Sequence, residues 1–69
     1  MIAKTRRDFI RHFKAEYLSA LKQQEAAWQE RTNPTIDYPY RREYWNNLID
    51  SLVRDNQLPK QAIDWVAPW

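Results

Sequence analysis

Glycine and cysteine are both absent from this chain of 69 residues, which nevertheless carries four Trp, four Tyr and two Phe. Without Gly, the chain lacks the residue that phosphate-binding loops and positive-φ turns normally require. Without Cys, no disulfide can support a domain whose size makes a single core only marginally stable. The sequence therefore predicts one all-α domain, residues 1–69, stabilised by large aromatic side chains.

An amphipathic pattern covers the first part of the chain, from Thr5 to about Glu30, with no Pro to interrupt it. Apolar residues recur there at steps of three, four and seven, which is the spacing of one helix face. We expect a single long helix of about 39 Å. Its packing face consists of Ile10, Phe13, Tyr17, Leu21 and Trp28.

Pro34 and Pro39 bound the segment RTNPTIDYPY, residues 31–40, and each disfavours helix at the residue before it. We expect an ordered, extended loop there. A second helix then runs from about Tyr40 to Asn56, with Pro39 as its first residue and Asn56 as a left-handed cap. Its apolar face consists of Trp45, Leu48, Ile49, Leu52 and Val53.

A short third helix is expected from Pro59 to Trp65 or Val66, and Ala62, Ile63 and Val66 are available to pack. The second helix, at about 26 Å, is too short to cover the first one. Because a small chain would otherwise expose an apolar patch, we expect a homodimer. The residues predicted for the core or the dimer contact are Ile10, Phe13, Tyr17, Leu21, Trp28, Trp45, Leu48, Ile49 and Leu52.

The sequence carries no pattern typical of an enzyme or a metal protein. His12 is the sole His, and it lies on the polar side of the first helix between Asp8 and Glu16, which suits surface ion pairs. We therefore expect no catalytic, metal or cofactor site. No apolar run predicts a membrane span or a signal peptide, so a cytoplasmic location is expected.

The best candidate for function is the aromatic and Arg-rich segment that follows the loop. Aromatic residues and Arg are enriched in binding hot spots, and a Pro-stiffened loop would present them already ordered. The predicted partner-binding residues are Tyr38, Tyr40, Arg41, Arg42 and Tyr44. Trp45 is in phase with Leu48 and Ile49, so packing is the better interpretation of that residue.

Nucleic-acid binding is the alternative function. The second helix, the turn NQLP and the third helix superficially resemble a helix-turn-helix, but Lys60, Gln61 and Asp64 offer poor chemistry for phosphates. The better surface is the basic start of the first helix, because residues 4–14 carry a net charge of +4. The candidate nucleic-acid contacts are Arg6, Arg7 and Arg11.

The segment WNNLIDSL at residues 45–52, followed by RDNQLP at 54–59, Trp65 and a final Pro68-Trp69, resembles the carboxyl half of small bacteriophage and prophage proteins. In size and helical hairpin the chain is also similar to the anti-quorum-sensing proteins of transposable Pseudomonas phages. That resemblance implies a small helical dimer that takes part in host takeover as an early inhibitor. The resemblance implies two host partners. One is a regulatory protein, a LuxR-type quorum-sensing activator bound at its DNA-binding domain, and the other is a motility protein, a type IV pilus assembly ATPase.

Overall fold

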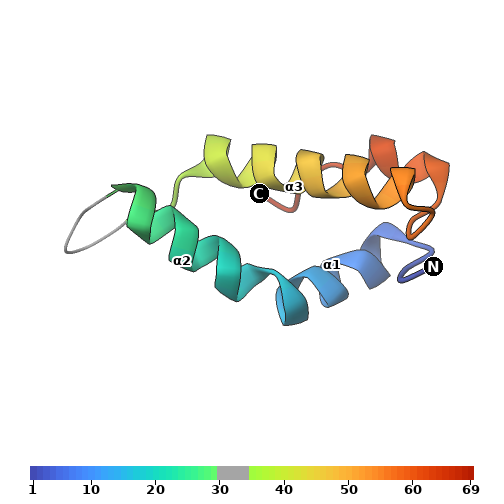
Figure 1. Ribbon diagram of the computed structural model, residues 1–69, viewed down its shortest axis with the longest axis horizontal. Helices are drawn as coiled ribbons and strands as arrows, with labels where there is room; N and C mark the ends of the chain where they lie inside the picture. The colour runs from blue at the N-terminus through green and yellow to red at the C-terminus, as the bar shows by residue number, and fades with distance from the viewer. Residues whose placement is uncertain (30–34) are drawn as a thin grey trace.

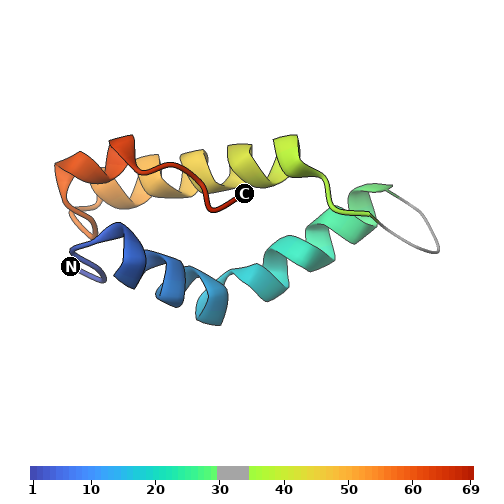
Figure 2. The same ribbon diagram turned by 180° about the vertical axis from the view of Figure 1, so that it is seen from behind.

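The computed structural model describes residues 1–29 and 35–69. Its elements are α1 (Arg6–Glu16), α2 (Leu18–Gln29), α3 (Tyr38–Arg54) and a short 3-10 helix, η1 (Lys60–Asp64). α1 and α2 follow each other along one side, α3 returns antiparallel to them, and η1 and the C-terminal segment fold back along α3 (Figures 1 and 2). The all-helical prediction is confirmed, and the described residues include no strand.

The expected first helix is divided at Tyr17, whose φ of −118° and ψ of −25° separate α1 from α2. The break is slight, because the Tyr17 amide still donates to the Phe13 carbonyl at 2.8 Å and the Leu21 amide to the Tyr17 carbonyl at 3.0 Å. Figure 1 shows α1 and α2 meeting at an angle below α3. The bend lets both halves pack on one straight partner helix, α3.

The core is an aromatic cluster between α1 and α3. The indole of Trp45 lies edge-on to Phe9 and Phe13, with ring centroids 5.1 and 5.3 Å apart, and all three side chains are buried. These distances lie in the range that aromatic pairs prefer. Leu21 and Ile49 are also buried as predicted, and Ile10, Tyr17, Leu48 and Leu52 pack against the cluster in partly buried positions.

Trp28, which was predicted for the core or the dimer contact, does not lie in the core, because 72% of its surface is exposed. Glu25 of α2 lies opposite Arg41, which is one turn inside α3. One turn further along α2, Trp28 therefore lies opposite the place where α3 begins. No complete turn of the partner helix remains there to cover the indole.

α3 begins at Tyr38, two residues earlier than predicted, because Asp37 caps it. The Asp37 carboxylate accepts a hydrogen bond from the Tyr40 amide at 3.1 Å, and Pro39 occupies the first turn, where its missing N–H costs nothing. Residues 31–34 of the predicted loop lie outside the described residues. Thr35 to Asp37 are non-helical, in agreement with the prediction.

The end of α3 confirms the left-handed cap predicted at Asn56, which has a φ of +60°. The Asn56 amide donates to the Val53 carbonyl at 3.1 Å and the Gln57 amide to the Leu52 carbonyl at 2.8 Å. These two bonds form a Schellman motif, which satisfies carbonyls that the helix end would otherwise leave open.

The predicted third helix is a single 3-10 element, and its packing differs from the expected one. A three-residue period puts Pro59, Ala62 and Trp65 on the face that packs against α3. Ala62 is buried accordingly, whereas Ile63 and Val66 are 62% and 71% exposed. The prediction that these two residues pack inside is wrong.

The C-terminal segment is attached to the helices by side chains. The Trp45 indole N–H donates to the Trp65 carbonyl at 3.1 Å, and Arg6 Nε donates to the Val66 carbonyl at 2.8 Å. The Trp69 ring lies edge-on to Phe13, with centroids 5.6 Å apart. This segment therefore completes one side of the core. Across residues 1–29 and 35–69, no helix combines the length and apolar character that crossing a bilayer requires.

Candidate docking surface

The five predicted partner-binding residues do not form one surface. All lie on the first two turns of α3, but a helix rotates by about 100° per residue, so consecutive side chains point in different directions. Tyr38 is exposed, Tyr40 and Tyr44 are partly buried, Arg41 is buried and Arg42 is exposed. The structure thus separates residues that the sequence places side by side.

Arg41 lies in the interior with an exposed fraction of only 6%, so the prediction that it belongs to an exposed docking surface is wrong. Its Nε and Nη2 atoms donate to the two carboxylate oxygens of Glu25, each at 2.8 Å. The guanidinium carbon also lies 5.7 Å from the centre of the Trp69 ring. A buried charge needs such partners, because leaving it unpaired costs several kcal/mol, roughly 3–5.

The ion pair changes the titration of both groups. The hydrogen bonds from Arg41, together with one from the Asp37 amide, hold the pKa of Glu25 below its ordinary value in spite of burial. The hydrogen bond to Glu25 raises the pKa of Arg41. Both groups are therefore charged at neutral pH, and the pair joins α2 to α3.

Tyr40 packs α3 against α2, and Tyr44 packs α3 against α1. The Tyr40 hydroxyl donates to Gln24 Oε1 at 2.9 Å, and the Tyr44 ring lies edge-on to Phe13 with centroids 6.2 Å apart. Burial raises the pKa of the Tyr44 phenol. These contacts stabilise the helical pair and leave only part of each ring for a partner.

An exposed apolar group does exist where α2 ends and α3 begins, at the end of the molecule remote from the N-terminus (Figure 1). It consists of Trp28, Ile36 and Tyr38, and we name it the tip cluster. Trp28 is the most exposed of the three, and about half of the surface of each of the other two is accessible. They line, with Gln29, Thr35, Asp37 and Pro39, an open hollow of about 490 Å³.

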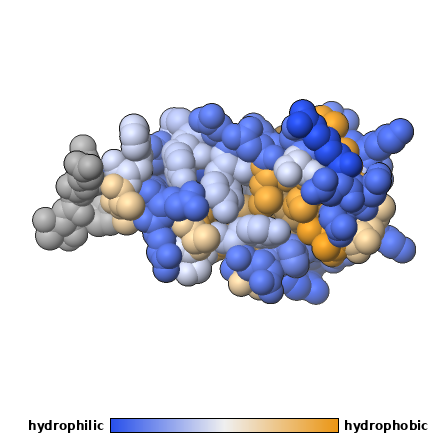
Figure 3. Space-filling view, in the orientation of Figure 1, coloured by the Kyte–Doolittle hydropathy of each residue, from blue (hydrophilic) through white to orange (hydrophobic). Residues whose placement is uncertain are grey.

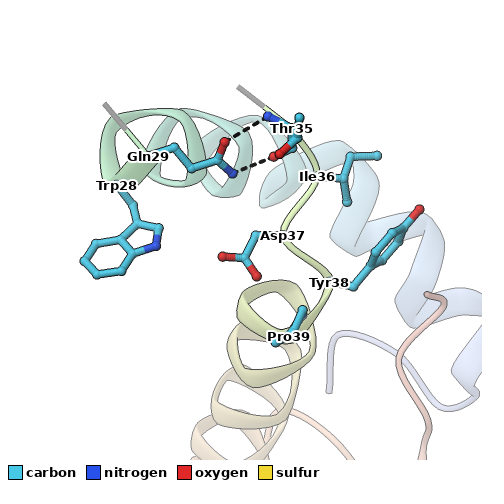
Figure 4. Close-up of a pocket in the computed structure, with 7 residues that line it drawn as sticks. All are labelled: Trp28, Gln29, Thr35, Ile36, Asp37, Tyr38 and Pro39. Carbon is cyan, nitrogen blue, oxygen red and sulfur yellow. Dashed lines mark hydrogen bonds between the residues drawn. The ribbon is translucent and has the colours of Figure 1, made fainter. Parts of the chain in front are cut away.

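Figure 4 shows the tip cluster on two sides of the extended backbone. The indole of Trp28 and the carboxylate of Asp37 lie on one side, whereas the side chains of Ile36 and Tyr38 point to the other. This alternation is what an extended segment imposes on successive residues. The side chains of the tip cluster therefore border an open hollow rather than enclosing a deep pocket.

Hydrogen bonds hold the backbone of the tip in place. The Gln29 side chain donates from Nε2 to the Thr35 carbonyl at 2.5 Å and accepts from the Thr35 amide through Oε1 at 2.8 Å (Figure 4). The Asp37 amide donates to Glu25 at 2.8 Å. α2 thus fixes this segment at two points, so a partner would meet side chains that are already positioned.

Sequence reasoning identified Tyr38 but missed Trp28 and Ile36. Ile36 lies between the two prolines, where an apolar residue has no helix face to join. Trp28 follows the helical spacing of the core, and only its place at the end of α2 distinguishes it. The first signal is visible in the sequence, whereas the second depends on where the partner helix begins.

Arg42 lies on another surface, along the outer side of α3. Together with Asn46 it lines a hollow of about 250 Å³ against the C-terminal segment, and Asn46 and Asp50 line a second hollow of about 310 Å³. Ile63 is common to both hollows. These depressions are shallow, and polar residues of α3 form one wall of each.

The three predicted nucleic-acid contacts, Arg6, Arg7 and Arg11, have different surroundings. Arg6 is bonded to the Val66 carbonyl and holds the C-terminal segment. Arg7 and Arg11 are exposed on the side of α1 that faces away from the core. Within residues 1–29 and 35–69, no group of three or more His, Cys, Asp or Glu side chains could hold a metal ion.

Comparison of this chain with models of protein families, with curated proteins and with solved structures found no match. The resemblance to phage proteins therefore stays a prediction.

Proposed function

We propose that this protein is a non-enzymatic binding module that inserts the tip cluster into an apolar groove of a partner protein and inhibits that partner by occlusion. The observation that carries the proposal is the exposure of Trp28, 72% of whose surface is accessible beside Ile36 and Tyr38. Trp and Tyr are typical of hot spots because they bury a large area and have few rotatable bonds whose freedom binding would restrict.

Two further features support this role. The tip backbone is braced by Gln29 and Glu25, so binding would not require much ordering of this segment. The tip also contributes little to the core, because Trp28, Ile36 and Tyr38 are exposed. Substitutions in the tip cluster should therefore change binding and leave folding intact.

The proposal is tested by affinity capture from a bacterial lysate with three forms of the protein. These are the wild type, a Trp28→Ala/Tyr38→Ala variant and an Ile63→Ala/Val66→Ala variant that removes exposed apolar area elsewhere. We expect at least one protein to be captured by the wild type and the control variant but not by the tip variant. Equal capture by a tip variant with an unchanged circular dichroism spectrum would contradict the proposal.

The resemblance to anti-quorum-sensing phage proteins suggests the first partners to test, namely a LuxR-type activator and a type IV pilus assembly ATPase. For the activator, occlusion predicts that added protein releases a labelled operator from the DNA-binding domain. The tip variant should release less operator at the same concentration. Release that does not depend on Trp28 and Tyr38 would show that another surface is used.

We further propose that the module forms a homodimer through the side of the helical pair that the C-terminal segment leaves uncovered. Tyr44, Leu48 and Leu52 recur at four-residue steps on that side of α3 and are only partly buried. Figure 3 shows apolar residues reaching the surface between α1 and α3. Light scattering at micromolar concentration should give about twice the chain mass, and a value of 8.5 kDa would refute the dimer.

A further inference from the structure

A second surface, on α1, has different chemistry from the tip cluster. Arg7, Arg11 and Lys14 are spaced by four and three residues, which places them within about 60° of the helix circumference. They lie opposite Phe9 and Phe13, which are buried, and all three are exposed. We name this row the basic stripe.

The basic stripe is not neutralised by acidic neighbours. The ion pairs of the described residues are Glu25–Arg41 and Asp50–Arg54, and neither includes a residue of the stripe. Asp8 is three residues before Arg11 on α1 but forms no ion pair with it, and Glu16 lies on the side of α1 away from the stripe. Lys4 and Arg6 come just before the stripe, and residues 4–14 together carry a net charge of +4.

The number of positive charges in the stripe suits contact with a phosphate backbone. From Arg7 to Lys14 the helix rises about 10 Å. Three positive charges along that length can neutralise about three phosphates of a duplex. Arg and Lys are the side chains that most often contact phosphate oxygens.

The composition of the stripe favours a nucleic-acid duplex over other anionic partners. A protein partner would need apolar residues at the centre of the interface, where charged residues, Lys in particular, are depleted. Unpaired nucleic acid would need exposed rings on which bases stack. The stripe offers neither. Phe9 and Phe13 of α1 are buried on the opposite side. His12 was predicted on the polar side of the helix, but it is partly buried beside the rings of Phe9 and Tyr17.

We propose that the basic stripe of α1 binds the phosphate backbone of a nucleic-acid duplex without reading its sequence. The stripe lies on α1, whereas the tip cluster lies at the far end of α2 (Figure 1). The proposal is therefore independent of the proposed docking function. Each of the two can fail without the other.

The test measures binding to a fluorescent DNA duplex of arbitrary sequence by anisotropy over a range of salt concentrations. Release of counterions from about three phosphates predicts a slope of about −3 in log K against log salt. An Arg7→Gln/Arg11→Gln/Lys14→Gln variant should lose at least about tenfold in affinity at low salt and most of that slope. Gln is a good helix former, so α1 should persist.

A matched control removes three positive charges elsewhere, in an Arg42→Gln/Arg54→Gln/Lys60→Gln variant. Its affinity should stay close to that of the wild type. Equal losses in the two variants would mean that net charge alone is responsible and would overturn the proposal. Absence of duplex binding, or tighter binding to polyglutamate than to the duplex, would also overturn it, and the latter would indicate an acidic protein partner.

Discussion

Arg41 is held inside the protein by one residue of another helix. Glu25 accepts from both Nε and Nη2 of its guanidinium, and the two groups are 5% and 6% exposed. Such a pair adds little net stability compared with apolar side chains, but breaking it is costly because one buried charge is left without a partner. At the scale of single residues, the pair fixes where α2 meets α3.

Glu25→Ala is expected to lower the free energy of unfolding by about 3–5 kcal/mol, because it leaves the Arg41 charge buried and unpaired. Urea unfolding followed by circular dichroism measures the change. Asp50→Ala, which breaks the exposed pair with Arg54, is the control and should cost less than about 1 kcal/mol. A Glu25→Leu/Arg41→Met variant should recover stability, and if it does not, the burial of the unpaired Arg41 charge is not the cause.

Stability should also fall in acid through Glu25. Because the pKa of Glu25 is lower in the folded than in the unfolded protein, the stabilisation is complete above the ordinary Glu pKa of about 4.3. It is lost as pH falls through the folded pKa. Unfolding free energies measured between about pH 6 and about pH 3 should therefore decline. The decline should be smaller in Glu25→Gln, and an equal decline would place the effect in other carboxylates.

Among the elements, α3 has one end that the sequence predicts and one that it misplaces. Asn56 ends the helix in a left-handed conformation, as predicted. The start lies two residues earlier than predicted, because the Asp37 side chain caps it. The break at Tyr17 is different, because no Pro or Gly marks it. The bend lets both α1 and α2 pack on α3. The local pattern does not contain this information, and by itself it predicts one unbroken helix.

Asn56→Gly is expected to stabilise the protein by about 0.5–1 kcal/mol, because Gly adopts a positive φ without the steric cost that a Cβ imposes. Asn47 is exposed in the middle of α3 and provides the opposite control. Asn47→Gly should be neutral or destabilising, since Gly is a poor residue for a helix interior. Thermal unfolding of both variants measures the two effects. A shift of the unfolding temperature with the same sign in both variants would contradict the left-handed cap at Asn56.

The whole molecule is an elongated helical hairpin, 39 × 19 × 19 Å, that the C-terminal segment closes on one side. Trp69 lies over Phe13, Trp45 and Arg41, so a residue at the end of the chain packs against the centre of the core. Trp28, by contrast, lies in solvent at the tip. The two tryptophans thus have different places in the molecule, Trp69 against the core and Trp28 at the tip.

Trp69→Ala should lower the free energy of unfolding by about 2 kcal/mol, less than the ~3–5 kcal/mol typical of fully buried Trp because this side chain is only partly buried. Trp28→Ala is the matched control and should change stability by less than about 0.5 kcal/mol. Chemical denaturation of the two variants gives both values. Similar losses in the two would show that the tip contributes to folding and would weaken its proposed role in binding.

The amino-acid pattern alone leads to an all-helical hairpin, the Asn56 cap and the buried Phe13, Leu21, Trp45 and Ile49, because each depends on local preference or helical periodicity. Periodicity does not tell which residues lie opposite one another. The burial of Arg41 depends on Glu25 lying across from it, and the exposure of Trp28 depends on α3 beginning where it does. Because of these two facts, the candidate docking surface is the tip cluster and not the aromatic and Arg-rich segment at residues 38–44. Both facts result from the packing of α2 against α3, which local preference and periodicity do not determine.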